Sequence, residues 1–176
     1  MRCLWLGHSQ IPKDDIEING EKAELERVNG ATIDNAHEAP ISDAIETDPD
    51  VIVVWLGGND LDNGRSPQEV VTDLINVVRY CQQHTQAVLV CNIEPRNYFN
   101  EDRATSYNNK ARTTNRLLTK LSAKHRYRVI NVSDPALIVD SCDGIHFSNV
   151  AMRRVIKKIE RAVDHAINDG TVEDYN

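Results

Sequence analysis

Short apolar runs recur along the chain, and each is followed by glycine or polar residues. Such continuous runs, rich in β-branched residues, are typical of parallel strands that are covered on both faces. The run Val-Ile-Val-Val-Trp-Leu at 51–56 is the strongest of them. The pattern predicts strands at 2–6, 25–28, 51–56, 87–93 and 127–132.

Between these runs, apolar residues recur at the three- and four-residue spacing of helices. Ser66 and Glu69 form a capping box with Pro67 at the first helical position, which predicts a helix that ends near Cys81. Further helices are expected at 103–124 and after Ser148, and a weaker one at 33–46. The segment 10–20 is polar, contains proline and glycine, and is predicted to be a loop.

Strands therefore alternate with helices along the chain, as they do in α/β folds with a parallel sheet. We expect five strands in the order 2-1-3-4-5, numbered along the sequence. The 176 residues fit one domain. We expect it to span residues 1–170, followed by a short acidic tail at 171–176.

Charge is distributed unevenly along the chain. The net charge of −7 argues against general nucleic-acid binding, which requires neutralisation of phosphates. Residues 1–102 contain 7 Lys and Arg against 19 Asp and Glu, whereas residues 103–176 contain 13 against 8. The basic third is explained either by the solvated faces of two helices or by a site for an anionic partner.

Cysteine usage and hydropathy indicate a cytoplasmic protein. The cysteines form no C-x-x-C pair and no zinc-ligand spacing, which predicts free thiols in a reducing compartment. They are Cys3, Cys81, Cys91 and Cys142. No apolar stretch is long enough to span a membrane, and the apolar run at 1–7 is too short for a signal peptide.

Polar residues follow the predicted strands. Sites in open parallel sheets form at the carboxyl ends of the strands, so these residues are expected to converge. The segments are Gly7-His8-Ser9, Asn29-Gly30-Ala31-Thr32, Gly57-Gly58-Asn59-Asp60, Glu94-Pro95-Arg96 and Asp143-Gly144-Ile145-His146.

The converging residues include every group that acyl transfer needs. Ser9 supplies a hydroxyl nucleophile and His146 a general base, since histidine titrates near neutral pH. Asp143, three residues before His146, can orient the imidazole. The backbone N–H groups of Ser9 and Gly30 and the amide of Asn59 are candidate oxyanion donors. This chemistry needs no metal or cofactor.

These segments resemble the conserved blocks of the SGNH, or GDSL-like, hydrolase superfamily in order and spacing. The resemblance covers Leu6-Gly7-His8-Ser9, Gly30-Ala31-Thr32, Gly57-Gly58-Asn59-Asp60 and Asp143-Gly144-Ile145-His146. It implies a flavodoxin-like α/β/α sandwich, a catalytic Ser9, Asp143 and His146, and an oxyanion hole of Ser9, Gly30 and Asn59. The motifs at 57–61, 93–96 and 143–148 also resemble an animal subgroup that includes esterase domains of retrotransposon proteins.

Two features depart from the family pattern. His8 stands where the family usually has aspartate, and the segment between Ser9 and Gly30 is short, which predicts an open acyl site. His8 and Arg96 are candidate substrate contacts, and a structural salt bridge is an equal explanation for Arg96. Cys142 is a rival nucleophile, although nothing near it indicates an activated thiol.

The leading hypothesis is a serine esterase that hydrolyses a small ester with a short, acetyl-like acyl group. The alternative is a module of the same fold, with little or no turnover, whose basic third binds RNA or another anionic partner. An α/β-hydrolase would need a G-x-S-x-G elbow, which is missing around Ser9. A flavodoxin-type nucleotide site would need a glycine-rich loop after the first strand. No pattern indicates an oligomeric state.

Overall fold

A five-stranded parallel sheet forms the centre of the computed structural model, which describes residues 1–12, 16–18, 20–85, 87–134, 137 and 143–169. Its strands lie in the order β4-β1-β5-β6-β7. They are β1 (Cys3–Gly7), β4 (Glu24–Arg27), β5 (Val51–Trp55), β6 (Ala87–Cys91) and β7 (Arg128–Ile130). This arrangement confirms the predicted fold class, the strand order and the parallel pairing.

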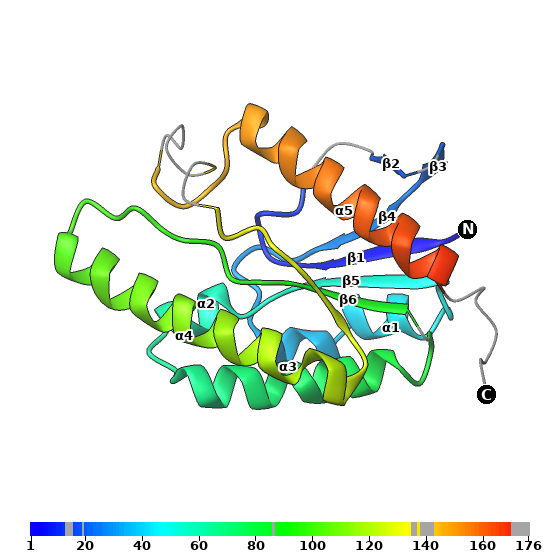
Figure 1. Cartoon of the computed structure of the whole chain (residues 1–176), viewed down its shortest axis with the longest axis horizontal. Helices are drawn as coiled ribbons and strands as arrows, with labels where there is room; N and C mark the ends of the chain where they lie inside the picture. The colour runs from blue at the N-terminus through cyan, green and yellow to red at the C-terminus, as the bar shows by residue number, and fades with distance from the viewer. Residues whose placement is uncertain (13–15, 19, 86, 135–136, 138–142, 170–176) are drawn as a thin grey trace.

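Helices cover both faces of the sheet, giving three layers (Figure 1). On one face lie α3 (Pro67–Cys81) and α4 (Glu101–His125), and on the other α5 (Asn149–Asp169). Each face has its own apolar cluster, because alternate strand residues point to opposite sides. Leu4 and Leu6 pack in the α3–α4 cluster, whereas Cys3 and Trp5 pack in the α5 cluster.

The helix α3 begins where the sequence predicts. Ser66 Oγ accepts a hydrogen bond from the backbone N–H of Glu69 at 3.3 Å, and Glu69 Oε2 accepts one from the Ser66 N–H at 2.8 Å. The helix α4 begins at Glu101, two residues before the predicted start. The side chain of Asn100 caps it by accepting from the N–H of Arg103 at 2.8 Å.

Three local predictions need correction. The segment expected to be a loop contains a small antiparallel pair, β2 (Glu17–Ile18) and β3 (Glu21–Lys22). The helix expected at 33–46 is split into η1 (Ile33–His37), a 3₁₀ helix, and α1 (Ile41–Ile45). Pro40 accounts for the split, because proline lacks the N–H of a helix interior and disfavours helical backbone in the residue before it.

The third correction is an additional short helix, α2 (Gly58–Asp62), directly after β5, where no helix was expected. No helix among the described residues has the length and apolar character needed to cross a membrane. Cys3, Cys81 and Cys91 are buried free thiols. Cys142 and the predicted tail at 171–176 lie outside the described residues.

Candidate active site

The structure brings Ser9 and His146 together from opposite ends of the chain. Ser9 follows β1, a strand flanked by β4 and β5 in the sheet. Its Oγ lies 2.7 Å from Nε2 of His146, which precedes α5. This is hydrogen-bonding distance, and it gives the serine hydroxyl a nitrogen acceptor for its proton.

Asp143 completes this chain of contacts. Its Oδ2 lies 2.6 Å from Nδ1 of His146, and its Oδ1 accepts from the backbone N–H groups of Ile145 and His146, each at 2.8 Å. An ionised carboxylate only accepts hydrogen bonds, so Nδ1 carries the proton and Nε2 presents its lone pair to Ser9. About half of each side chain is exposed, 44% for His146 and 51% for Asp143, so water reaches this pair.

The loop that carries this pair is docked on the segment after β6. Asn97 donates its backbone N–H to the Gly144 carbonyl at 2.6 Å. Gly144 has φ +71°, and a Cβ added there would lie 2.0 Å from the Asn97 carbonyl oxygen. Glycine is therefore required at position 144 by both backbone conformation and space.

Gln10 is a residue of the site that the sequence reasoning missed. Its side chain is 2% exposed and connects the segment after Ser9 to both neighbours of His146. Nε2 donates to the Ile145 carbonyl at 2.5 Å, and Oε1 accepts from the Phe147 N–H at 3.2 Å. One amide thus holds the serine and histidine segments together. The only sequence signal for this role of Gln10 is its position directly after Ser9.

Asn59, the first candidate oxyanion donor, lies at the start of α2. Its Nδ2 donates to the Ala31 carbonyl at 2.9 Å, and this bond uses one of the two amide hydrogens. The neighbouring Asp60 is buried and accepts from the Ile33 N–H at 3.0 Å. These two contacts tie α2 to the segment that follows β4.

Gly30, the second candidate donor, lies in that segment. The backbone turns between Val28 and Ala31, where the Ala31 N–H donates to the Val28 carbonyl at 3.1 Å. Gly30 takes the left-handed φ of +71° in this turn and is exposed. The structure thus places Asn59 and Gly30 on two connected segments.

Arg96 lies behind Asn59, and its side chain is only 3% exposed. Its Nη2 donates to Asn59 Oδ1 at 2.9 Å, and its Nη1 donates to Asp62 at 3.2 Å and to the Tyr98 hydroxyl at 3.0 Å. The guanidinium also lies over the Tyr107 ring, 4.9 Å from its centroid. Because Asn59 Oδ1 accepts from Arg96, the orientation of the Asn59 amide is fixed.

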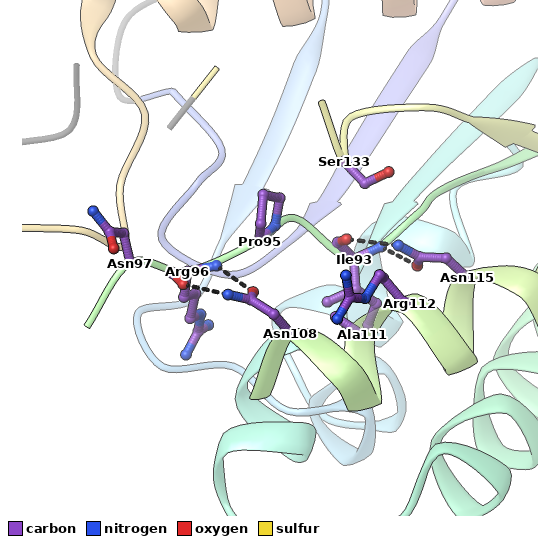
Figure 2. A pocket seen from close by; sticks show the side chains of 9 residues that line it. All are labelled: Ile93, Pro95, Arg96, Asn97, Asn108, Ala111, Arg112, Asn115 and Ser133. Atoms are coloured by element: carbon purple, nitrogen blue, oxygen red, sulfur yellow. Dashed lines mark hydrogen bonds between the residues drawn. The ribbon is translucent and has the colours of Figure 1, made fainter. Parts of the chain in front are cut away.

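The backbone around Arg96 is held by two asparagines of α4. Asn108 pairs with the backbone N–H and carbonyl of Arg96 at 3.0 and 2.8 Å. Asn115 pairs in the same way with Ile93 at 2.7 and 2.8 Å, as Figure 2 shows. They line a cavity of about 390 Å³ between α4 and this segment.

His8 is buried, with 2% of its surface exposed, and contacts the protein interior. Its Nδ1 accepts from the Gln10 N–H at 3.3 Å, and its Nε2 lies 3.6 Å from Oε1 of the fully buried Glu94. Burial lowers the pKa of His8 below the ordinary value of 6.5, although Glu94 opposes this shift. The burial of His8 argues against the expected substrate contact. The Trp55 indole shares Glu94 with His8 through a 3.1 Å bond to Oε2.

A groove of about 700 Å³ is lined by Ser9 and His146. Its wall comes from the segment after β1, from the end of β4 and from the first turns of α5. No group of three or more His, Cys, Asp or Glu side chains is arranged to hold a metal ion in the part of the chain that the structure describes.

The chain matches the model of the GDSL-like Lipase/Acylhydrolase family over residues 9–154. No curated protein matches its sequence. The narrower resemblance to an animal subgroup with retrotransposon-protein esterase domains stays a prediction.

Solved structures share the fold at low sequence identity. A GDSL-like lipase from Bacteroides thetaiotaomicron VPI-5482 has a TM-score of 0.72 at 14% identity, with 96% of this chain and 88% of that chain covered. A lipase/acylhydrolase from Enterococcus faecalis has a TM-score of 0.70 at 16% identity, with coverages of 93% and 95%. An acetylxylan esterase from Geobacillus stearothermophilus has a TM-score of 0.67 at 11% identity, with coverages of 92% and 93%. Two catalytic mutants of that esterase, one serine-to-alanine and one histidine-to-alanine, also match.

Proposed function

The chain belongs to the GDSL-like lipase/acylhydrolase family, and from this premise we propose that it is a serine esterase with Ser9 as nucleophile, His146 as general base and Asp143 as the orienting carboxylate. The observation that carries the proposal is the continuous contact from Ser9 Oγ through the His146 ring to Asp143, at 2.7 and 2.6 Å. The two catalytic mutants of the acetylxylan esterase of similar fold replace a serine and a histidine, the residue types proposed here.

In the first half of the reaction, Ser9 Oγ attacks the ester carbonyl carbon while its proton passes to His146 Nε2. The negative charge of Asp143 stabilises the protonated His146 ring. The tetrahedral intermediate then collapses, and His146 returns the proton to the departing alcohol oxygen. In the second half, His146 takes a proton from a water molecule that attacks the acyl-serine. Collapse of the second tetrahedral intermediate releases the carboxylic acid, and His146 returns the proton to Ser9 Oγ.

The oxyanion of the tetrahedral intermediate would be held by the N–H groups of Ser9 and Gly30 and by the Asn59 amide. The role of Asn59 is supported by its fixed orientation, because Arg96 binds the oxygen of the amide and leaves the NH₂ group as the donor. Arg96 is a positioning residue in this account, since its buried guanidinium acts through Asn59 and not on the substrate.

A short acyl group fits the short segment between Ser9 and Gly30, which leaves little chain to build a lid. The likeness to acetylxylan esterases points the same way. We expect acetyl esters to be hydrolysed faster than long-chain esters. Much faster cleavage of octanoyl than of acetyl esters would contradict this substrate preference without affecting the assignment of Ser9.

The test compares hydrolysis of p-nitrophenyl acetate and butyrate by the wild type and by Ser9→Ala. Loss of the nucleophile is expected to lower kcat by about 10³- to 10⁶-fold, as in other serine hydrolases. The variant is a necessary control because surface nucleophiles also release nitrophenol. Equal slow rates for both proteins would refute the proposal for these esters.

A further inference from the structure

The groove beside Ser9 and His146 has a positive character that hydrolysis of a neutral ester does not require. Among its described lining residues, two are arginines, Arg27 and Arg153, and none is an aspartate or glutamate. The chain as a whole carries a net charge of −7. The described lining residues therefore carry an excess of positive charge next to the proposed catalytic pair, which favours an anionic ligand.

Arg27 approaches the nucleophile from the sheet. It ends β4 and lies opposite Gly7 of β1. Leu25, two residues earlier, packs against the α5-side cluster, so Arg27 points to that same face. Its Nη2 donates to the Ser9 carbonyl at 3.3 Å. This bond uses one of the five N–H donors of the guanidinium and holds the charged group against the backbone of Ser9 itself.

Arg153 approaches the groove from α5. Val155 and Ile159 of this helix are fully buried against the sheet, whereas Arg153 is exposed. Arg153 lines the groove together with Met152. The two arginines therefore come from different layers and converge on one groove. Arg154, the next residue along the helix, is also exposed but is not among the residues that line the groove.

Polar and apolar residues contribute in equal number to the lining of the groove. Ile11, Ile16 and Phe147 form buried parts of this wall, and Met152 and Ile156 are partly buried. Arg27 is half-buried beside these residues, so its charge is less screened by water than that of the exposed Arg153. A ligand that fits this wall has an apolar portion and one anionic group.

We propose that Arg27 and Arg153 bind an oxyanion group, a carboxylate or a phosphate, on the ester substrate of this site. The inference rests on the proposed esterase function and adds the substrate class, an acyl ester of an anionic molecule. The planar guanidinium presents paired donors that match both oxyanions.

The test uses three acetyl esters with the same aromatic ring: 4-acetoxybenzoate, 4-acetoxyphenylphosphonate and the neutral methyl 4-acetoxybenzoate. Each kcat/KM is divided by the rate of alkaline hydrolysis of the same ester, which removes differences in leaving group. We expect at least one anionic ester to exceed the neutral one by about tenfold or more at low salt. The better of the two identifies the oxyanion, and the preference is expected to decrease with added NaCl.

Arg27→Gln and Arg153→Gln are expected to lower the anionic-to-neutral ratio by about tenfold each. Arg154→Gln removes an equal charge from the same helix outside the groove, so it is the matched control and should leave the ratio unchanged. Binding of 4-acetoxybenzoate to the Ser9→Ala protein, measured by calorimetric titration, should weaken with Arg153→Gln and not with Arg154→Gln.

Two results would overturn the inference. One is Ser9-dependent turnover with no preference for either anionic ester, which would leave the esterase function intact. The other is an equal effect of Arg153→Gln and Arg154→Gln, which would indicate only the general field of the helix. Absence of Ser9-dependent turnover of every ester would instead refute the proposed function and remove the basis of the inference. Tight, salt-sensitive binding of single-stranded RNA that Arg154→Gln weakens as much as Arg153→Gln would favour an extended nucleic-acid surface.

Discussion

The α3–α4 side and the α5 side of the site differ in the burial of their charged side chains. On the α3–α4 side, Arg96 is buried and donates to Asn59, which fixes the orientation of the Asn59 amide. On the α5 side, a groove of about 700 Å³ exposes Arg153 to solvent. The first side is already organised before a substrate arrives, whereas the second has charged groups available for one.

This difference fits the two proposed roles, which are stabilisation of the transition state on the first side and selection of the substrate on the second. Donors that stabilise a transition state are most effective when they need no reorganisation during the reaction, which requires a supporting network. Groups that select a substrate must instead be accessible to it. Substitutions on the α3–α4 side, here called the closed side, should therefore lower kcat. Substitutions on the α5 side, the open side, should change the preference among substrates.

The largest loss of kcat in this comparison is expected from Asp143→Asn, which changes the carboxylate that contacts the His146 ring. The amide would place an NH₂ group or a neutral oxygen against Nδ1, which disfavours the tautomer whose Nε2 accepts the Ser9 proton. We expect kcat for p-nitrophenyl acetate to fall by about 10³- to 10⁴-fold. An intact melting temperature would exclude unfolding as the cause, and a loss below tenfold would contradict the role of Asp143.

The next effect concerns the closed side. Asn59→Ala is expected to lower kcat by about 10²- to 10³-fold with little change in KM, because it removes an oxyanion donor. Arg96→Lys keeps the buried charge but loses the fork that reaches Asn59, Asp62 and Tyr98. We expect a smaller fall in kcat from this variant.

The double variant separates the two roles. If Arg96 acts through Asn59, Arg96→Lys should have little further effect on kcat in the Asn59→Ala background. Fully additive losses would show that Arg96 contributes independently of Asn59 and would refute its positioning role. Thermal melting of all three proteins checks that the fold survives.

The smallest of these effects is expected from Gln10→Leu, which removes the amide that connects the two catalytic segments. The Ile145 carbonyl and the Phe147 N–H would lose their partner, and His146 would be held less closely to Ser9. We expect kcat to fall about tenfold, equivalent to about 1.4 kcal/mol in the barrier. Gln68→Leu on the exposed surface of α3 is the control, and equal kcat values for the two variants would contradict the role of Gln10.

The strands of the sheet and the contact between Ser9 and His146 could be predicted, because apolar runs locate the strands and the fold class brings the ends of parallel strands together. Continuous apolar runs identified the strands of the parallel sheet, and the segments after those strands contained Ser9 and His146. The short helix α2 and the β2–β3 pair were missed, since a few residues with a mixed pattern carry little periodic signal.

Contacts between distant polar side chains could not be predicted in the same way. Gln10 has its partners more than 130 residues away, and nothing in its neighbourhood indicates them. Arg96 could be assigned to the substrate or to a structural ion pair from the sequence, and only its burial and its bond to Asn59 distinguish these roles. Such contacts depend on the folded arrangement of segments, which local propensity does not encode.

The most direct test of the central claim is covalent labelling of the nucleophile. A fluorophosphonate reacts with an activated serine, whose oxygen displaces fluoride from phosphorus. Intact-mass and peptide mass spectrometry should find one adduct, located on Ser9, in the wild type and none in Ser9→Ala, with strongly slowed labelling in His146→Ala. Labelling of another residue, or equal labelling of wild type and Ser9→Ala, would contradict the assignment of Ser9 as the activated nucleophile.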